Sequence, residues 1–306
     1  MRALWPLLKQ TVWKWNQDKS MKLSGALAFY AALSLAPIIV VSIKILSSLF
    51  SAEVATRQVQ YQMESLIGPA GAKAISDMLI QAAKPNSGII ATVVSLIILL
   101  FTASGVFAEL QDSLNTIWNV KPREDVPWSH LIKNRFLSLA MVFVILFLLL
   151  ISMFVSTALT ALTRRFANET TVLAFTTDFI VSVIVVTLLI TMLFRFLPDV
   201  RIDWRDVFLG ALVTGVLFKL GQYLLALYFK FGSVTSLYGA AGSFVAVLLW
   251  VYYSGWIVFF GAEFTSVYAK SRGRGFQPTE IAQPMAPVDR ATQGLPPEAR
   301  PAPVNT

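Results

Sequence analysis

Three ionisable residues interrupt stretches of sequence that are otherwise apolar. Lys44 follows the run "PIIVVSI", Asp178 lies within "LAFTTDFIVS", and Lys219 lies within "VTGVLFKLGQ". An ionisable side chain inside a bilayer costs about 2.5–3.5 kcal/mol on insertion scales, and residues placed there commonly mark a path for substrate or ions. A buried ammonium group attracts anions, so these residues point first to recognition of an anionic group on a lipid or another amphiphile.

Lys44 and Asp178 are expected at the same depth. Each lies six residues from the outer end of its apolar stretch. At 1.5 Å per residue, both lie roughly 9 Å below the outer boundary. In one interpretation they form an ion pair or line a cavity, and in the other Lys44 extends alone to the outer headgroups. The sequence leaves both interpretations open.

Lys219 lies near the middle of its apolar stretch. A connection of about eleven residues joins this stretch to the next, so the two should be antiparallel neighbours. This places Lys219 at the depth of Tyr252, Tyr253 and Trp256, although Tyr and Trp usually favour the membrane interface. Either Lys219 is satisfied within a helix–helix contact, or these residues together line a polar cavity for an anionic headgroup or substrate.

Few residues in this chain suit catalysis or metal binding. It contains one histidine, His130, and no cysteine. Neither a GxxxxGK[ST] nor a GxGxxG motif is present. No nucleophile with an adjacent base can be recognised. We therefore expect no enzymatic activity, no metal, no cofactor and no nucleic-acid partner. Glu109 and Glu263, near the inner ends of their stretches, are expected to be solvated or paired with loop arginines.

The elements that position these residues are membrane-spanning helices. Hydrophobic residues make up 56% of the 306 residues, charged residues make up only 14%, and the mean hydropathy is +0.66. A span needs roughly 20 mostly apolar residues, and the bilayer forces such a segment to be helical. The sequence predicts an all-α polytopic membrane protein with a transmembrane domain over 23–270. Its six predicted spans are 24–50, 88–108, 136–162, 172–197, 206–230 and 242–268.

The basic residues set the orientation. Of the 25 Lys and Arg residues, 17 lie in the two termini and in the second and fourth connections, and 6 lie in the remaining connections. Because cytoplasmic loops carry the excess of basic residues, both termini are predicted to be cytoplasmic. With six predicted spans, the chain is expected to be a multi-pass membrane protein.

Three segments outside the spans have distinct patterns. Residues 1–22 are expected to form a cytoplasmic amphipathic helix at the interface, with Leu4, Trp5 and Trp15 on one face. Residues 51–87 should form an external helical hairpin, which either caps the bundle or lies on the headgroups. Residues 271–306 are rich in proline without apolar periodicity, so we expect a disordered cytoplasmic tail.

Small residues form one face of the first span. They allow close approach of a neighbouring helix, and a proline after them is expected to bend the helix, opening a gap towards Lys44. These packing and kink positions are Gly25, Ala28, Ala32, Ala36 and Pro37.

Four stretches resemble the YihY/BrkB family of bacterial inner-membrane proteins, over roughly residues 20–270. They are "GALAFYAALSLAPIIVVSI", "FTASGVFAELQDSLNTIWNV", "LFRFLPDVRIDWRDVFLGAL" and "LYGAAGSFVAVLLWVYYSGWIVFFGAEFTSVYA", in that order. The resemblance implies a six-helix, multi-pass protein of the bacterial cytoplasmic (inner) membrane with both ends cytoplasmic. The family was long labelled a ribonuclease, but metal-dependent hydrolysis needs clusters of His and carboxylate ligands that this sequence does not show.

Two functional hypotheses remain. The first is a transporter or flippase-like protein for an envelope lipid or another amphiphile. The second is a structural or accessory envelope protein that transports nothing and binds other envelope proteins. Membrane lipids are expected partners in both cases, and a homo-oligomer is compatible with either.

Overall fold

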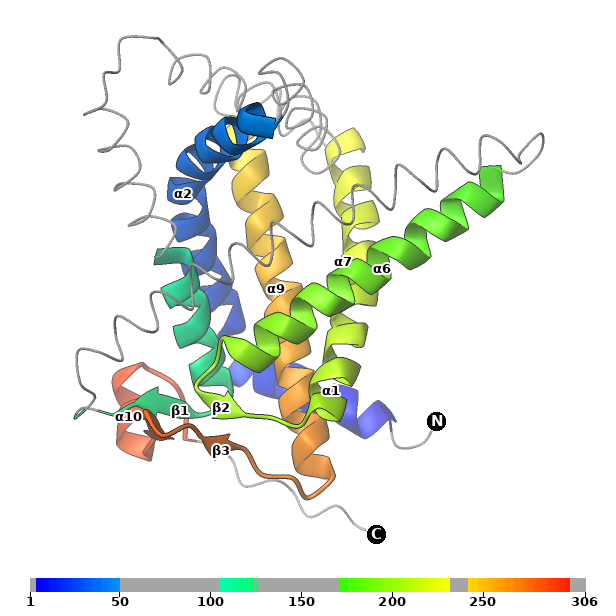
Figure 1. The fold of residues 1–306 in the computed structure, drawn as a ribbon. Coiled ribbons are helices and arrows are strands. Elements are labelled where there is room, and N and C mark those ends of the chain that lie inside the picture. Colours follow the sequence, from blue (N-terminus) through cyan, green and yellow to red (C-terminus); the bar gives the residue numbers. More distant parts are fainter. Residues whose placement is uncertain (1–3, 50–104, 124, 126–170, 232–241, 298–306) are drawn as a thin grey trace, which may run out of the picture.

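The structure, a computed structural model, describes residues 4–49, 105–123, 125, 171–231 and 242–297, and the structural statements that follow refer to these. Four long helices dominate the fold (Figure 1). They are α2 (Ser20–Leu49), α6 (Thr171–Phe196), α7 (Trp204–Phe231) and α9 (Gly242–Ser271).

The long helices agree with four of the six predicted spans. Within the described part, three segments are long and apolar enough to cross a membrane, namely Phe179–Phe196, Trp204–Leu225 and Val247–Ser271. A further helix over 105–117 overlaps the last four residues of the second predicted span, 88–108, and continues beyond it. The span 136–162 and the external hairpin 51–87 lie outside the described residues, so the six-span topology and its orientation stay predictions.

Helix α9 is the centre of the described bundle. It packs against α2, α7 and α1 (Leu4–Gln17), whereas α6 packs against α7. Figure 1 shows α9 between α2 and α7, with α6 leaning outward across the bundle. The aromatic-rich last span is therefore an internal element, which explains why its tyrosines and tryptophans are not confined to an interface.

Helices α7 and α9 approach each other through two reciprocal Gly–Thr contacts. A Cβ added at Gly210 would lie 1.8 Å from Thr265 Oγ1, and one added at Gly261 would lie 1.7 Å from Thr214 Oγ1. Each threonine hydroxyl also donates to the carbonyl four residues earlier, at 2.7 Å for Thr214 and 2.8 Å for Thr265. Gly210 meets Thr265 and Thr214 meets Gly261, so residue numbers rise along α7 as they fall along α9. The two contacts confirm that α7 and α9 are antiparallel neighbours.

Helix α2 packs on α9 partly through the predicted small-residue face. Ala28 is buried, Ala32 is half-buried and Gly25 is exposed. The closest approach lies beside this face, where a Cβ added at Gly255 would meet Ser24 at 3.0 Å. Helix α2 continues through Pro37, and its ribbon changes direction in the later part (Figure 1). The side chain of Ala36 lies outside the described residues.

The residues after Ser271 are ordered through 297, which differs from the expected disordered tail. They form β3 (Gln277–Pro278), β4 (Ala282–Pro284) and α10 (Pro287–Thr292). Strand β4 pairs antiparallel with β1 (Val120–Pro122), and β3 pairs antiparallel with β2 (Val200–Arg201). These short strands take their partners from distant loops, so no periodicity within the tail itself could have predicted them.

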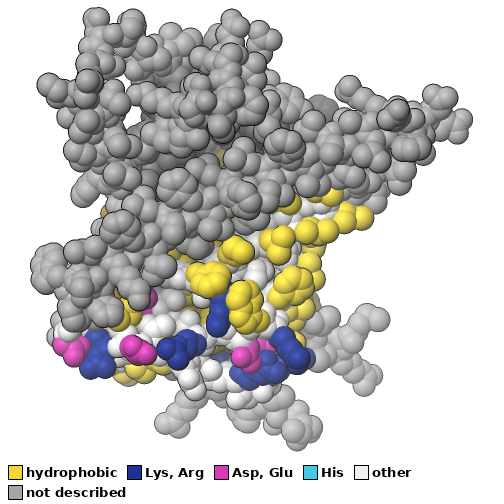
Figure 2. All heavy atoms as spheres, in the orientation of Figure 1, with side chains coloured by type: hydrophobic (Ala, Val, Ile, Leu, Met, Phe, Trp, Pro, Cys, Tyr) yellow, Lys and Arg dark blue, Asp and Glu magenta, His cyan; other side chains and the backbone are white. Residues whose placement is uncertain are grey.

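Charged side chains gather at one end of the molecule. Figure 2 shows Lys, Arg, Asp and Glu in a band at the end where α1, α10 and the strands lie, with hydrophobic side chains above it. A buried apolar cluster underlies this band and includes Leu114, Trp118, Phe194, Val207 and Phe259. Helices α1 and α10, which precede and follow the bundle, thus lie at the same end of it.

Candidate functional site

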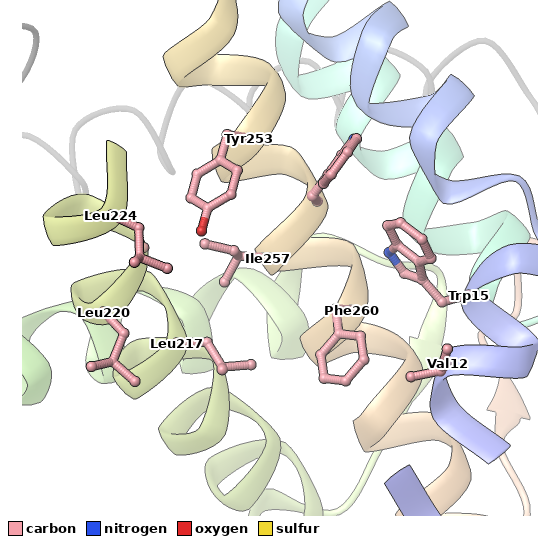
Figure 3. A pocket seen from close by; sticks show the side chains of 10 residues that line it. Val12, Trp15, Leu217, Leu220, Leu224, Tyr253, Ile257 and Phe260 are labelled. Atoms are coloured by element: carbon pink, nitrogen blue, oxygen red, sulfur yellow. The ribbon is translucent and has the colours of Figure 1, made fainter. Parts of the chain in front are cut away.

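An apolar groove runs along the surface of α9, with α7 and α1 as its two walls (Figure 3). Its volume is about 360 Å³, within the range of roughly 300–1,000 Å³ that is usual for small-molecule sites. Three of its residues are exposed, namely Val12, Leu220 and Leu224, so within the described part of the chain the groove opens sideways. The lining residues are Val12, Trp15, Leu217, Leu220, Gly221, Leu224, Tyr253, Trp256, Ile257 and Phe260.

The shape of the groove depends on Gly221 and on two tryptophans. A Cβ at position 221 would lie 2.7 Å from both Ile257 Cδ1 and Tyr253 Cε1, so glycine is what lets the Tyr253 ring lie against α7. On the other wall, the rings of Trp15 and Trp256 meet edge to face, with centroids 5.8 Å apart. This contact attaches α1 to α9 and closes that side of the groove.

The predicted aromatic residues do meet at this place. Tyr253 and Trp256 line the groove, and Tyr252 packs edge to face on Trp256 with centroids 5.1 Å apart. The Tyr253 hydroxyl is a polar group in a lining that is otherwise mostly apolar (Figure 3). The groove can therefore hold an apolar chain and offers one hydroxyl for a hydrogen bond.

Lys219 faces away from this groove. Its ammonium group donates to Ser182 Oγ of α6 at 3.0 Å and lies 5.7 Å from the centroid of the Tyr223 ring. Positions 219 and 221 lie about 200° apart around a helix, because each residue turns it by about 100°. The expected common depth with Tyr253 agrees with the Gly221–Tyr253 contact, but Lys219 points to α6. That it lines a substrate cavity stays a prediction.

Lys44 and Asp178 lie within α2 and α6, respectively. Their side chains lie outside the described residues, so whether they form a pair stays a prediction.

A buried group of charged residues joins three separate segments at the charged end. Lys14 Nζ of α1 lies 2.7 Å from Glu263 Oε2 of α9 and 3.4 Å from Asp18 Oδ2. Arg290 Nη2 of α10 lies 2.5 Å from Asp18 Oδ1. The side chains of Asp18, Glu263 and Arg290 are at most 3% exposed. Two basic and two acidic side chains therefore lie together where water is scarce, and their contacts offset the cost of burying charge.

Neighbouring polar groups complete this buried group. Lys14 also donates to the carbonyl oxygen of Ile117 at 2.7 Å and to Ser266 Oγ at 3.3 Å. Arg290 donates to Asn119 Oδ1 at 3.1 Å. Burial pushes the pKa of Asp18 upward, but Lys14, a hydrogen bond with Glu263, and Arg290 together hold that pKa below its ordinary value. Asp18 is consequently an ionised acceptor in folded protein.

Sequence reasoning missed this arrangement. Glu263 was expected to be solvated or paired with a loop arginine, but it is fully buried and paired with Lys14 of the N-terminal helix. The spacing of Lys14 and Asp18, four residues apart on one helix face, is a signal for a local ion pair. Glu263 and Arg290 lie 245 and 272 residues after Asp18, and nothing in the sequence places them beside it.

A second polar network fixes the connection between α6 and α7. Asn115 Nδ2 donates to Asp199 Oδ2 at 2.8 Å, Gln111 Nε2 donates to Oδ1 at 3.1 Å, and the Asp199 N–H donates to Asn115 Oδ1 at 2.8 Å. Burial raises the pKa of Asp199, and the two amide hydrogen bonds only partly oppose that rise. This network attaches the helix over 105–117 to the loop, which is a structural role.

The described residues contain no group of three or more His, Cys, Asp or Glu side chains arranged to hold a metal ion. The groove, by contrast, has an apolar lining, and the ligand that such a lining suits is itself apolar.

Comparison with known proteins gives one family. The family described as Virulence factor BrkB matches residues 11–286. A UPF0761 membrane protein of Alcanivorax borkumensis is 26% identical over 252 residues, which are 82% of this chain and 57% of that protein. A UPF0761 membrane protein of Legionella pneumophila strain Philadelphia 1 is 28% identical over 261 residues, which are 84% of this chain and 61% of that protein. The chain thus spans about three fifths of the length of these relatives. No solved structure matches.

Proposed function

The chain belongs to the Virulence factor BrkB family and is an integral membrane protein, and from this premise we propose that it is a transporter or flippase-like protein for an envelope lipid or another amphiphile. The apolar chain of the amphiphile binds in the groove on α9 between α7 and α1, and its headgroup stays at the membrane surface near α1.

The observation that carries this proposal is the position and lining of the groove. Its lining comes from the apolar segments of α7 and α9, and α1 closes one side with Val12 and Trp15. Apolar lining with an opening to the side suits an alkyl chain that enters from the bilayer, since an ion or a sugar would find few partners there.

Helix α1 suits the level of the headgroups. Trp5 is 74% exposed and Trp13 is 47% exposed, while Lys9 on the same helix is exposed as well. Tryptophan and lysine are the residues that anchor a helix at the interface between hydrocarbon and water. An amphiphile seated in the groove would therefore have its polar end close to this helix.

The sequence limits the energy sources that could drive such movement. The sequence contains no nucleotide-binding motif. Movement of the amphiphile accordingly runs downhill, uses an ion gradient, or depends on a partner protein.

Reconstitution in liposomes tests the proposal. Vesicles of phosphatidylethanolamine and phosphatidylglycerol carry a fluorescent phospholipid in both leaflets, and movement is followed by quenching of the probe in the outer leaflet. Leu224→Trp adds bulk at the mouth of the groove, and Leu227→Trp adds the same bulk to an exposed position of the same helix that does not line it. We expect wild type and Leu227→Trp to move the lipid and Leu224→Trp to be slowed at least several-fold.

Two outcomes count against transport. Equal rates for both tryptophan variants would show that the groove is not the binding site. Absence of movement with the wild-type protein, for this probe and for other amphiphiles of the envelope, would favour the accessory role.

A further inference from the structure

The carboxyl groups of Asp18 and Glu263 both contact Lys14 Nζ, at 3.4 Å and 2.7 Å, and each has one oxygen without a hydrogen-bond partner. Asp18 Oδ2 and Glu263 Oε1 are buried, and neither has a hydrogen-bond partner among the described residues when both groups are treated as carboxylates. The two side chains are nevertheless close enough to hydrogen-bond to each other. Two carboxylate oxygens cannot form that bond unless one of them carries a hydrogen.

The neighbouring cations do not supply the missing hydrogen. Lys14 donates to Ile117 O, Glu263 Oε2 and Ser266 Oγ, and neither unpaired carboxyl oxygen has a donor among the described residues. Its contact with Asp18 Oδ2, at 3.4 Å, is an ion pair without a hydrogen bond. Arg290 binds the other oxygen of Asp18, Oδ1. Neither Lys14 nor Arg290 therefore donates a hydrogen bond to Asp18 Oδ2 or to Glu263 Oε1.

We propose that this carboxyl pair is a proton-binding site, in which one proton lies between Asp18 Oδ2 and Glu263 Oε1 at neutral pH. Two carboxylates that share a site cannot both stay ionised without strong repulsion, and a shared proton removes that repulsion and satisfies both oxygens. Glu263 is the donor and Asp18 the acceptor, because Asp18 is held ionised by Lys14 and Arg290.

Charged and titratable groups reach this site from each element packed around it. Helix α1 contributes Lys14, the turn that follows it contributes Asp18, α9 contributes Glu263, and α10 contributes Arg290. The end of the helix over 105–117 and the turn before β1 contribute neutral groups, the Ile117 carbonyl and the Asn119 amide. Lys19, next to Asp18, is exposed and its Nζ lies near Gly294. With the proton bound, the four charged residues carry one net positive charge, and they are neutral overall without it.

Proton binding at this site affects how firmly α1 packs against α9. Loss of the proton leaves two anionic carboxylates in contact at the junction of α1 and α9, so a rise in pH should loosen α1 from α9. A fall in pH from neutral should not loosen this contact until Asp18 itself is protonated.

Infrared spectroscopy of the full-length protein in lipid nanodiscs at pH 7 tests the inference. A protonated carboxylic acid has a carbonyl band above the amide bands, which ionised carboxylates lack. We expect the wild-type protein to show such a band and Glu263→Gln to lose the intensity of one acid, because the glutamine amide donates to Asp18 without a titrating proton. Glu109→Gln, which removes a half-buried glutamate elsewhere, should keep that intensity.

Isotope labelling makes the test independent of whether Glu263→Gln folds. Labelling all glutamate side-chain carboxyls with carbon-13 should shift the same band in the wild type and in Glu109→Gln. An unshifted band after glutamate labelling, or identical acid intensity in the wild type and folded Glu263→Gln, would overturn the proposal. Hydrogen exchange of the α1 amides should also speed up with pH beyond the intrinsic rate in the wild type, and should lose that excess in Glu263→Gln.

Discussion

Replacement of Gly261 by alanine tests the described packing of α7 against α9. The new Cβ would lie 1.7 Å from Thr214 Oγ1, 2.9 Å from its Cβ and 3.1 Å from its Cγ2. Rotation of the threonine side chain could move the hydroxyl away, but it would break the 2.7 Å hydrogen bond to the Gly210 carbonyl. The threonine Cβ is fixed to the backbone, so α7 and α9 themselves would have to separate.

The expected loss of stability follows from two opposing terms. Overpacking of a tight interior contact costs about 1–3 kcal/mol. Because the clash involves an atom fixed to the backbone, we take the upper end of that range. Alanine in place of glycine favours the helix by about 1 kcal/mol. The unfolding free energy of Gly261→Ala should therefore fall by about 2 kcal/mol.

Denaturant unfolding in detergent micelles, followed by tryptophan fluorescence, measures this change. Gly25→Ala is the matched control, because its Cβ would lie at an ordinary 3.8 Å from Tyr252. It should leave stability unchanged or raise it by up to about 1 kcal/mol. Combining Gly261→Ala with Thr214→Ala should restore part of the loss, since contacting residues are not additive. If Gly261→Ala is as stable as Gly25→Ala, the described α7–α9 contact is wrong.

Three further predictions concern the polar contacts. Asn115→Ala removes the two hydrogen bonds that Asn115 makes with Asp199, and unpaired buried polar groups cost about 1–3 kcal/mol each. The midpoint of thermal unfolding should therefore fall. An unchanged midpoint would refute the described network. The pKa of Asp18 is lowered in the folded state, so the stability that Asp18 contributes is present above the ordinary aspartate pKa and is lost as pH falls through the folded value. Acidification should therefore release α10, which faster proteolysis after Arg290 would report. Proteolysis that does not change with acidification would show that the Asp18–Arg290 pair is absent. Lys219→Met should lower the unfolding free energy, because the hydrogen bond to Ser182 of α6 is lost. Lipid movement should stay near the wild-type rate. Complete loss of movement in a folded variant would instead place this lysine on the transport path.

The long helices could be predicted because their apolar segments are continuous. Helices α6, α7 and α9 begin and end within three residues of the predicted spans 172–197, 206–230 and 242–268. The unusual depth of Tyr253 and Trp256 drew attention to two residues that line the groove, although the polar cavity expected there with Lys219 stays a prediction. Both inferences rest on position along the chain, which fixes depth in a membrane.

Direction around a helix was harder to predict than depth. The expected common level of Lys219 and Tyr253 agrees with the Gly221–Tyr253 contact, but which neighbour Lys219 faces depends on the rotation of α7, and that is set by the Gly210 and Gly261 contacts. The same limit hid the groove, since Gly221 gives no sign in the sequence that a tyrosine ring lies against it.

Contacts between distant segments could not be predicted at all. The tail after Ser271 lacks apolar periodicity, yet it pairs with loops more than 70 residues away through β3 and β4. Arg290 completes a buried ion pair with Asp18 that neither segment predicts alone. Such pairings stabilise the charged end of the bundle, where local sequence carries little information about its partners.

Photocrosslinking of a bound lipid tests the central claim most directly. The wild-type protein is incubated in nanodiscs with a phospholipid that carries a photoactivatable group within one acyl chain, and the labelled residues are identified by mass spectrometry. Labels on Tyr253, Ile257 and Phe260 of α9, which an acyl chain reaches through the groove, are the predicted result. Labels confined to Phe208 and Leu212, which are exposed on α7 outside the groove, would contradict it.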